Sequence, residues 1–237
     1  MSATERILRV QNERISLLLH ADVFTPSVHG VKGFGEAIQI RRGDRVLEIG
    51  TGTGILAILS AKKGGRVTAT DISQKAVELA RKNAERNNVE IDFRVGSLFA
   101  PVKGKKWDVV IANVAQEVLS PRLRRRFSPE RVRGIHAGMR GNEILLKLLR
   151  EAPQYMRPTS ELYVAAYGMS NHEKTIQYIL THFDAQLVNF HSSPVKEYIY
   201  EDLDWYERQA KAGTIMMYKK SDKYFSDFSV FKLRIKK

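Results

Sequence analysis

The stretch VLEIGTGTG at residues 46–54 decides how this chain folds. An apolar run leads into a turn with three glycines, and a second apolar run over residues 55–59 follows it directly. This order is typical of a buried strand, a tight turn and the start of a helix. Because glycine has no Cβ, the backbone of such a turn can approach a bound ligand closely.

Two acidic residues strengthen the case for a nucleotide-like ligand. Glu48 stands two positions before the first glycine, and Asp71 ends the next predicted strand. A carboxylate about 20 residues after such a turn is where the ribose of an adenosine would be held. The alternative for Asp71 is an ordinary acid at the start of a helix. The glycines together with Asp71 therefore predict a cofactor site.

The composition predicts a globular protein without disulfides or a metal centre. The chain has 237 residues, 43% of them hydrophobic and 27% charged, which suits one sizeable core. No apolar run approaches the ~18 residues of a membrane span, and the first ten residues lack the apolar centre of a secretory signal. Cysteine is absent and the six histidines show no metal-ligand spacing. We expect a cytoplasmic protein.

The chain is strongly basic, which bears on its partners. It has 39 Lys and Arg against 26 Asp and Glu, a formal net charge of +13. Such a surface favours polyanions, and nucleic acid or the ribosome comes first among them. A generally basic proteome is the alternative explanation.

Strand-like and helix-like segments alternate along the chain. We expect a leading helix over residues 3–19, a loop over 21–35 and an irregular basic segment over 114–137. Predicted strands span 45–49, 66–70, 90–95, 107–112, 160–167, 185–191 and 228–235; predicted helices span 53–63, 73–87, 139–156 and 171–182. The pattern predicts an α/β fold, a doubly wound Rossmann-like mixed sheet of seven strands with the last antiparallel and helices on both faces. The ligand site should lie at the carboxyl ends of the strands.

Four segments in order carry a family resemblance. VLEIGTGTG is followed by TATDIS (68–73), FRVGSLFAPV (93–102) and WDVVIANV (107–114), and this layout resembles the class I S-adenosylmethionine-dependent methyltransferases. The resemblance covers roughly residues 20–190 and is closest to the release-factor glutamine methyltransferase branch. Pyridine-nucleotide dehydrogenases share the general plan, but their usual G-x-G-x-x-G differs from the G-x-G-x-G found here.

The resemblance implies a domain organisation. Residues 1–36 would form an N-terminal helix and a segment that caps the cofactor, and residues 37–237 the methyltransferase domain. Within that domain, 117–137 is a basic insert and 192–227 an elaboration before the last strand.

The resemblance also implies a binding site for S-adenosyl-L-methionine. The glycine turn would lie under the methionyl part, Glu48 would reach the amino-acid group and Asp71 would accept the two ribose hydroxyls. Ile72 would pack on the adenine, unless it is simply core, and Ser97 with Leu98 would hold the adenine amine. The complete predicted cofactor set is Glu48, Gly50, Thr51, Gly52, Gly54, Asp71, Ile72, Ser97, Leu98 and Asn113.

The acceptor side departs from the pattern of that branch. Its members carry Asn/Asp-Pro-Pro-Tyr/Phe after the fourth strand, where the side-chain amide and a proline carbonyl bind a target NH2. Here the sequence is Asn113-Val114-Ala115-Gln116, so the asparagine is kept and both prolines and the aromatic are lost. Ribosomal-protein lysine methyltransferases, whose acceptor is an amine, look similar at this point. A planar amide, a nucleobase amine and a lysine amine therefore all stay open as acceptors.

Candidate residues for the acceptor side come from three segments. Asn113 and His29 are the predicted catalytic residues, although an exposed loop histidine is the alternative for His29. Glu117 could hold a cationic amine or be a solvated acid. The predicted substrate-binding residues are Phe24, Val114, Ala115, Arg124, Arg125 and Arg126.

The arginines belong to the run PRLRRRFSPERVR at residues 121–133, which holds six of them. Guanidinium groups grip phosphate or carboxylate, and Phe127 could stack on a base. A solvated helix face is the alternative. The sequence thus predicts methyl transfer to a nitrogen on RNA or on a ribosome- or translation-associated protein. Two alternatives are a small-molecule methyltransferase and a non-catalytic module that keeps the cofactor fold.

Overall fold

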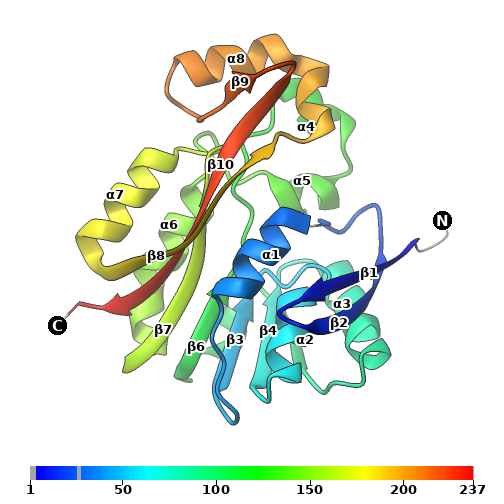
Figure 1. The fold of residues 1–237 in the computed structure, drawn as a ribbon, viewed down its shortest axis with the longest axis vertical. Helices are drawn as coiled ribbons and strands as arrows, with labels where there is room; N and C mark the ends of the chain where they lie inside the picture. The colour runs from blue at the N-terminus through cyan, green and yellow to red at the C-terminus, as the bar shows by residue number, and fades with distance from the viewer. Residues whose placement is uncertain (1–3, 26–27, 237) are drawn as a thin grey trace.

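The chain is built around one central β-sheet flanked by helices on both faces (Figure 1). Its structure is a computed structural model, which describes residues 4–25 and 28–236. The sheet has the order β5-β4-β3-β6-β7-β10-β8, and the short strand β9 pairs with β10. The strands are β3 (Arg45–Ile49), β4 (Arg66–Asp71), β5 (Asp92–Val95), β6 (Trp107–Ala112), β7 (Met156–Tyr167), β8 (Phe183–Pro194), β9 (Tyr218–Lys220) and β10 (Lys223–Ile235).

The predicted fold class is confirmed. Strands β3 to β7 pair in parallel, and the last strand, β10, runs antiparallel to both β7 and β8. The seven predicted strands make up the continuous path, and β9 is an additional strand at its rim. The order reverses between β3 and β6, so the carboxyl ends of these two strands flank the expected site.

Two hydrophobic cores, one on each face of the sheet, hold the helices in place. Val46 and Val109 pack on one face and Leu47 and Val110 on the other, as a parallel sheet covered on both sides requires. The first face carries α1 (Val28–Ala37), α2 (Ile55–Lys62) and α3 (Gln74–Arg86); the second carries α6 (Glu143–Glu151), the 3-10 turn η2 (Ala152–Tyr155) and α7 (His172–His182). A further 3-10 turn, η1 (Ala100–Val102), follows β5. No described helix is long and apolar enough to cross a membrane.

The predicted helix over residues 3–19 is wrong. The segment forms an antiparallel hairpin of β1 (Thr4–Val10) and β2 (Glu13–Leu19). Gln11 and Asn12 between them have φ of 47° and 70°, the left-handed conformation of a two-residue hairpin turn. Ile15 and Leu17 are fully buried on one face of β2. The buried residues therefore repeat every two positions, as in a strand, and not every 3.6 positions, as in a helix.

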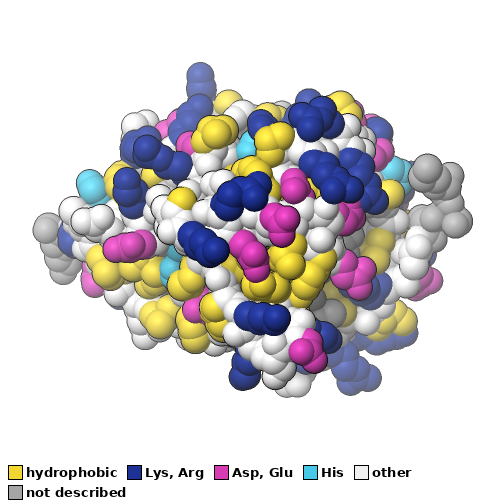
Figure 2. All heavy atoms as spheres, turned by 90° about the horizontal axis from the view of Figure 1, so that it is seen from above, with side chains coloured by type: hydrophobic (Ala, Val, Ile, Leu, Met, Phe, Trp, Pro, Cys, Tyr) yellow, Lys and Arg dark blue, Asp and Glu magenta, His cyan; other side chains and the backbone are white. Residues whose placement is uncertain are grey.

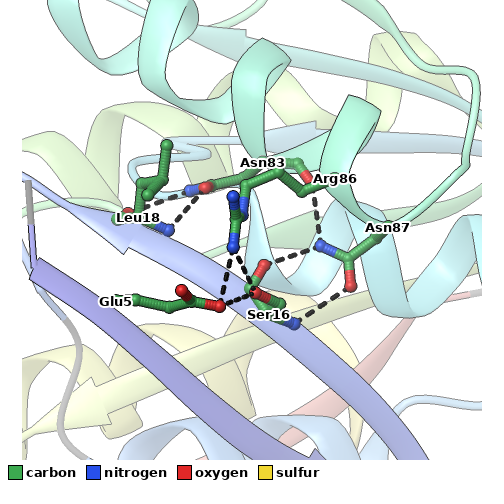
Figure 3. A network of polar contacts seen from close by, with 6 residues as sticks. All are labelled: Glu5, Ser16, Leu18, Asn83, Arg86 and Asn87. Carbon is green, nitrogen blue, oxygen red and sulfur yellow. Dashed lines mark hydrogen bonds and ion pairs between the residues drawn. The ribbon is translucent and has the colours of Figure 1, made fainter.

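Asn83 of α3 and Asn87, which follows the last residue of α3, hold this hairpin against the sheet domain (Figure 3). The Asn83 side chain accepts from the Leu18 amide at 2.7 Å and donates to the Leu18 carbonyl at 3.1 Å. Asn87 makes the same pair of bonds with Ser16, at 3.0 and 2.7 Å. Asn83 also donates to the Thr53 carbonyl at 2.9 Å. The two side chains therefore satisfy the edge of β2 and tie the hairpin to the glycine turn.

The segment over 21–35, expected as a loop, contains most of helix α1. Gly33 and Gly35 in this segment serve close packing rather than turns. A Cβ on Gly35 would overlap Val10 Cγ1, and one on Gly33 would lie 2.9 Å from the His191 ring. A larger residue would push α1 away from the hairpin and from β8.

The basic insert and the C-terminal elaboration pack together into a cap at one end of the sheet (Figure 1). We use "the cap" for residues 117–137 and 192–227. The insert is helical rather than irregular, with α4 (Pro121–Arg126) and α5 (Pro129–Ile135) each beginning at a serine N-cap followed by proline. The elaboration adds η3 (Glu197–Asp202), α8 (Leu203–Lys211) and β9. Leu123, Ile135, Tyr198 and Tyr206 are buried in their shared core.

Candidate active site

A cavity of about 340 Å³ opens at the carboxyl ends of β3, β4 and β6. Nearly all predicted cofactor residues line it, and the predicted substrate residues Phe24, Val114 and Ala115 line it as well. The cofactor residues that it brings together are Glu48, Gly50, Thr51, Gly52, Asp71, Ile72, Ser97, Leu98 and Asn113. Gly54 is the exception. A Cβ on Gly54 would lie 3.0 Å from the Ala80 Cβ, so this glycine lets α2 pack on α3.

The backbone of the glycine turn is shaped by its neighbours. Gly50 has φ of 78° and donates to the Thr70 carbonyl at 2.8 Å; a Cβ there would lie 2.9 Å from the Asn113 carbonyl oxygen. Gly52 has φ of 53°, and the nearest atom to its Cβ would be the Phe24 carbonyl oxygen at 3.6 Å. The first glycine is therefore needed for packing, whereas the second borders open space.

Two carboxyl groups line the cavity, the fully buried Glu48 and the partly exposed Asp71. Glu48 is 1% exposed and accepts a hydrogen bond from the Thr51 hydroxyl at 2.5 Å, and burial raises its pKa to about 8. Asp71 accepts from the Ser73 amide at 2.9 Å on one oxygen and from the Gly52 amide at 3.0 Å on the other. Burial also raises the pKa of Asp71. Cationic or hydroxyl groups of a ligand would offset the cost of burying these charges.

The cavity fits an adenosine-type cofactor. Its volume lies in the range of about 300–1,000 Å³ that is usual for small-molecule sites. Each Asp71 oxygen has a lone pair beyond the one that its amide uses, so both can accept a ribose hydroxyl. Within the described part of the chain, the buried Thr53 hydroxyl at the cavity has no hydrogen-bond partner. Ile72 is 52% exposed, which leaves its side chain available to an adenine ring.

A second, smaller cavity of about 90 Å³ adjoins the first. Both are lined by Phe24, Asn113, Val114, Ala115 and Gly134. The walls of the smaller one add the rings of Tyr167, His191 and Phe228 and the polar side chains of Gln116, Glu117 and Lys196. Asn113 thus stands where a group in the second cavity would meet a ligand in the first.

Glu117 lies in the second cavity and is 5% exposed, so the solvated interpretation of this residue is wrong. Its carboxylate accepts from Lys196 Nζ at 2.6 Å and from the Tyr198 hydroxyl. The cation paired with Glu117 is thus Lys196 of the same chain rather than an amine of the substrate. Sequence reasoning missed Lys196 and Tyr198 because they come from the elaboration over 192–227, far from every motif.

The arginine cluster lies apart from both cavities. Arg124, Arg125 and Arg126 are exposed on α4, and none of them lines either cavity. Arg126 is ion-paired with Glu201. The face of the molecule seen in Figure 2 carries many lysines and arginines with acidic side chains between them, around an apolar centre.

The structure describes the side chain of Phe127 but not that of His29. Phe127 is buried and carries the Arg131 guanidinium over its ring at 4.0 Å, so it is not free to stack on a base. His29 falls within α1, but its side chain lies outside the part of the chain that the structure describes.

Several known methyltransferases are similar to this chain in sequence. The family model for ribosomal protein L11 methyltransferase (PrmA) matches residues 35–131. A putative protein N5-glutamine methyltransferase of Methanocaldococcus jannaschii is 32% identical over 174 residues, which is 70% of this chain and 83% of that relative. The ribosomal protein L11 methyltransferase of Dictyoglomus thermophilum is 44% identical over 81 residues, and this chain spans only 27% of its length.

Solved structures share the fold. A methyltransferase from Pyrococcus furiosus superimposes with a TM-score of 0.54 at 20% identity, covering 91% of this chain and 88% of that one. A 16S rRNA N2 methyltransferase of T. thermophilus, in complex with AdoMet and guanosine, gives 0.56 at 12% identity over 100% of this chain and 52% of that one.

The fold and the site together define an S-adenosylmethionine-dependent methyltransferase. The chain belongs to the class I methyltransferases, in the branch that contains the protein glutamine methyltransferases. It is an enzyme, and the interpretation as a non-catalytic module is set aside.

Proposed function

We propose that this enzyme methylates a nitrogen atom on a macromolecule of the translation machinery. The observation that carries the proposal is the junction of the two cavities at Asn113, which gives an acceptor group a place beside the cofactor. The relatives support the choice of target, since their names specify a glutamine nitrogen and ribosomal protein L11. A cytoplasmic enzyme that meets the ribosome or its RNA fits the net charge of +13.

Five of the predicted cofactor residues have a defined role in this proposal. Glu48 binds the cationic amino group of the cofactor, and Asp71 accepts hydrogen bonds from the two ribose hydroxyls. Ile72 packs against the adenine, and the segment of Ser97 and Leu98 borders its amine. When bound, S-adenosyl-L-methionine supplies a methyl group already activated on a sulfonium.

The protein then has to position the acceptor and manage one proton. The acceptor nitrogen forms a bond to the methyl carbon while the carbon–sulfur bond breaks and its electron pair stays on sulfur. One proton leaves the nitrogen. Asn113 orients the nitrogen through its side-chain amide, and His29 is the candidate that carries the proton to solvent.

A small-molecule acceptor is the competing proposal. The cap favours a macromolecule because its exposed arginines lie outside the cavities, where only a large substrate would reach them. Incubation with methyl-labelled cofactor and a cell extract, separated into RNA, protein and small-molecule fractions, tests the proposal directly. Label in the protein or RNA fraction is expected, and label confined to small molecules would overturn it.

A further inference from the structure

Residues 20–25, which we call the strap, form part of the wall of the first cavity. The strap lies between β2 and α1. Asp22, Val23 and Phe24 line the first cavity, and Phe24 lines the second cavity as well. The strap also comes close to the glycine turn, since a Cβ on Gly52 would lie 3.6 Å from the Phe24 carbonyl oxygen. A ligand in the first cavity is therefore covered by the strap on one side.

The strap is fixed to α3 by an apolar contact. Val23 is 5% exposed and packs with Ala76 and Leu79 of α3 and with Leu18 of β2. Because opening the strap on this side would expose these apolar side chains to water, the contact with α3 resists local opening.

The strap meets the cap through contacts of a different kind, and we call this line of contact the seam. The hydroxyl of Ser128, the N-cap of α5, donates to the Asp22 carboxylate at 2.8 Å. Lys196 Nζ lies 4.0 Å from the centre of the Phe24 ring. The side chains of Asp22 and Lys196 are 27% and 26% exposed, so water can take the place of their partners. The seam is therefore easier to open than the contact with α3.

Asp22 connects the two sides of the strap. Its Oδ1 accepts the hydrogen bond from Ser128, and its Oδ2 accepts one from Lys75 Nζ of α3 at 3.0 Å. The ion pair with Lys75 stays on the α3 side, whereas the bond with Ser128 crosses the seam. The Ser128 hydroxyl is held in place because it also accepts from the Arg131 amide at 3.3 Å.

We infer that the seam between the strap and the cap is the gate through which the cofactor enters and leaves, and that the hydrogen bond between Asp22 and Ser128 is its latch. The inference rests on the proposed function, because it places the cofactor in the first cavity, but it holds for any acceptor. Cofactor exchange then requires only the seam to open while the strap stays attached to α3. Loss of the latch should therefore speed both entry and exit, whereas loss of a direct contact with the cofactor would speed exit alone.

The test measures the association and dissociation rates of S-adenosylhomocysteine on the full chain by surface plasmon resonance. Ser128→Gly removes the hydroxyl, and glycine at an N-cap keeps most of the stability of the helix. Both rates should rise about fivefold, as expected for the loss of one partly exposed hydrogen bond to a charged group. Asp22→Ala should have a similar effect, and the two changes together should have no larger effect than Asp22→Ala alone.

Two variants serve as matched controls. Lys75→Met removes the partner of Asp22 that lies on the α3 side of the strap. Glu5→Ala removes a carboxylate with the same kinds of partner, the Ser16 hydroxyl at 2.9 Å and the Arg86 guanidinium of α3 at 2.6 Å, but Glu5 lines neither cavity. Both controls should exchange S-adenosylhomocysteine within about twofold of the wild-type rates.

An exchange of the two side chains tests the latch itself. Asp22→Ser combined with Ser128→Asp rebuilds the hydrogen bond with donor and acceptor reversed, and aspartate is also a good N-cap for α5. This double variant should return both rates toward those of the wild type. Circular dichroism checks that every variant is folded.

Three results would overturn the gate: unchanged rates in Ser128→Gly and Asp22→Ala, faster dissociation without faster association, or an equal effect of Lys75→Met. An exchanged pair that stays as fast as the single variants would overturn the latch. A wild type that binds no S-adenosylhomocysteine would overturn the proposed function, whereas normal wild-type binding with any of the other results overturns only the role of the seam.

Discussion

The two adjoining cavities, proposed to hold the cofactor and the acceptor, are assembled over very different sequence distances. In the first, the bond between the Gly52 amide and Asp71 joins residues 19 positions apart. In the second, the bond between Lys196 and Glu117 joins residues 79 positions apart. The part of the first cavity from Glu48 to Asp71 thus comes from one strand–turn–helix–strand unit, whereas the second cavity joins segments from across the fold.

The largest expected effect is on cofactor binding in the first cavity. Gly52→Val should weaken cofactor binding by at least a hundredfold, because it places a branched side chain where the ligand packs. Calorimetry measures the dissociation constant, and circular dichroism checks that the fold is retained.

Gly104→Val is the matched control for Gly52→Val. Gly104 also has a positive φ, 75°, with nothing within 4 Å of its Cβ, and it lies outside the cavity. The control carries the same backbone strain but should bind cofactor normally. Equal affinities for the two variants would show that Gly52 does not border the ligand.

The next effect tests the boundary between the cavities. Asn113→Ala should reduce turnover by roughly a hundredfold and change cofactor affinity far less. The backbone amide of Asn113 donates to the Ile49 carbonyl at 3.2 Å, and alanine preserves that bond. Steady-state kinetics on the labelled substrate fraction and calorimetry give the two quantities. An equal loss of turnover and of cofactor affinity would mean that Asn113 contacts the cofactor and not the acceptor.

The comparison also explains what the sequence could predict. The sheet, its last antiparallel strand and most cofactor residues follow from local patterns, in which neighbouring residues determine the conformation. The hairpin over residues 4–19 was misjudged because Ile7, Ile15 and Leu18 have a spacing close to that of a helix. The turn at Gln11 and Asn12 was the local signal that could have corrected it.

The acceptor pocket could not be predicted in the same way. Glu117 was recognised as a candidate, but its partner Lys196 lies on a segment without a motif, and only packing of the cap brings the two together. The arginine run is a different case. Its density suggested a place at the site, yet α4 turns Arg124 and Arg125 to the surface of the cap while Leu123 is the residue that it buries.

Glu48 gives the cofactor cavity a predictable pH dependence. Burial raises its pKa to about 8, so the free enzyme carries a proton there at neutral pH. Binding of a cationic amino group requires the carboxylate, and cofactor affinity should therefore rise roughly tenfold per pH unit up to about 8. Above about pH 8 it should fall again, because the free amino group of the cofactor then loses its own proton. For the same reason the free protein loses stability as the pH rises from the ordinary carboxyl pKa to about 8.

Dissociation constants between pH 6 and 9 measure this effect, and calorimetry in two buffers counts the proton released. Glu48→Gln should flatten the profile, since the amide has no proton to lose. A wild-type affinity that does not change over this range would contradict the assignment of Glu48 to the amino group.

The smallest expected effect concerns the cap surface. If the arginines of α4 bind phosphate groups of RNA, Arg124→Gln with Arg125→Gln should lower RNA affinity several-fold. The slope of log K against log salt should also decrease by about 2, or ~0.9 for each phosphate that is no longer neutralised.

Arg126→Gln alone should change little, because Glu201 already pairs with Arg126. Lys103→Gln with Lys105→Gln removes the same charge from two exposed lysines in the loop before β6, at the amino ends of the parallel strands. Equal effects of the two double variants would mean that the arginines of α4 contribute to RNA binding only through the net charge. The choice of substrate would then depend on the second cavity.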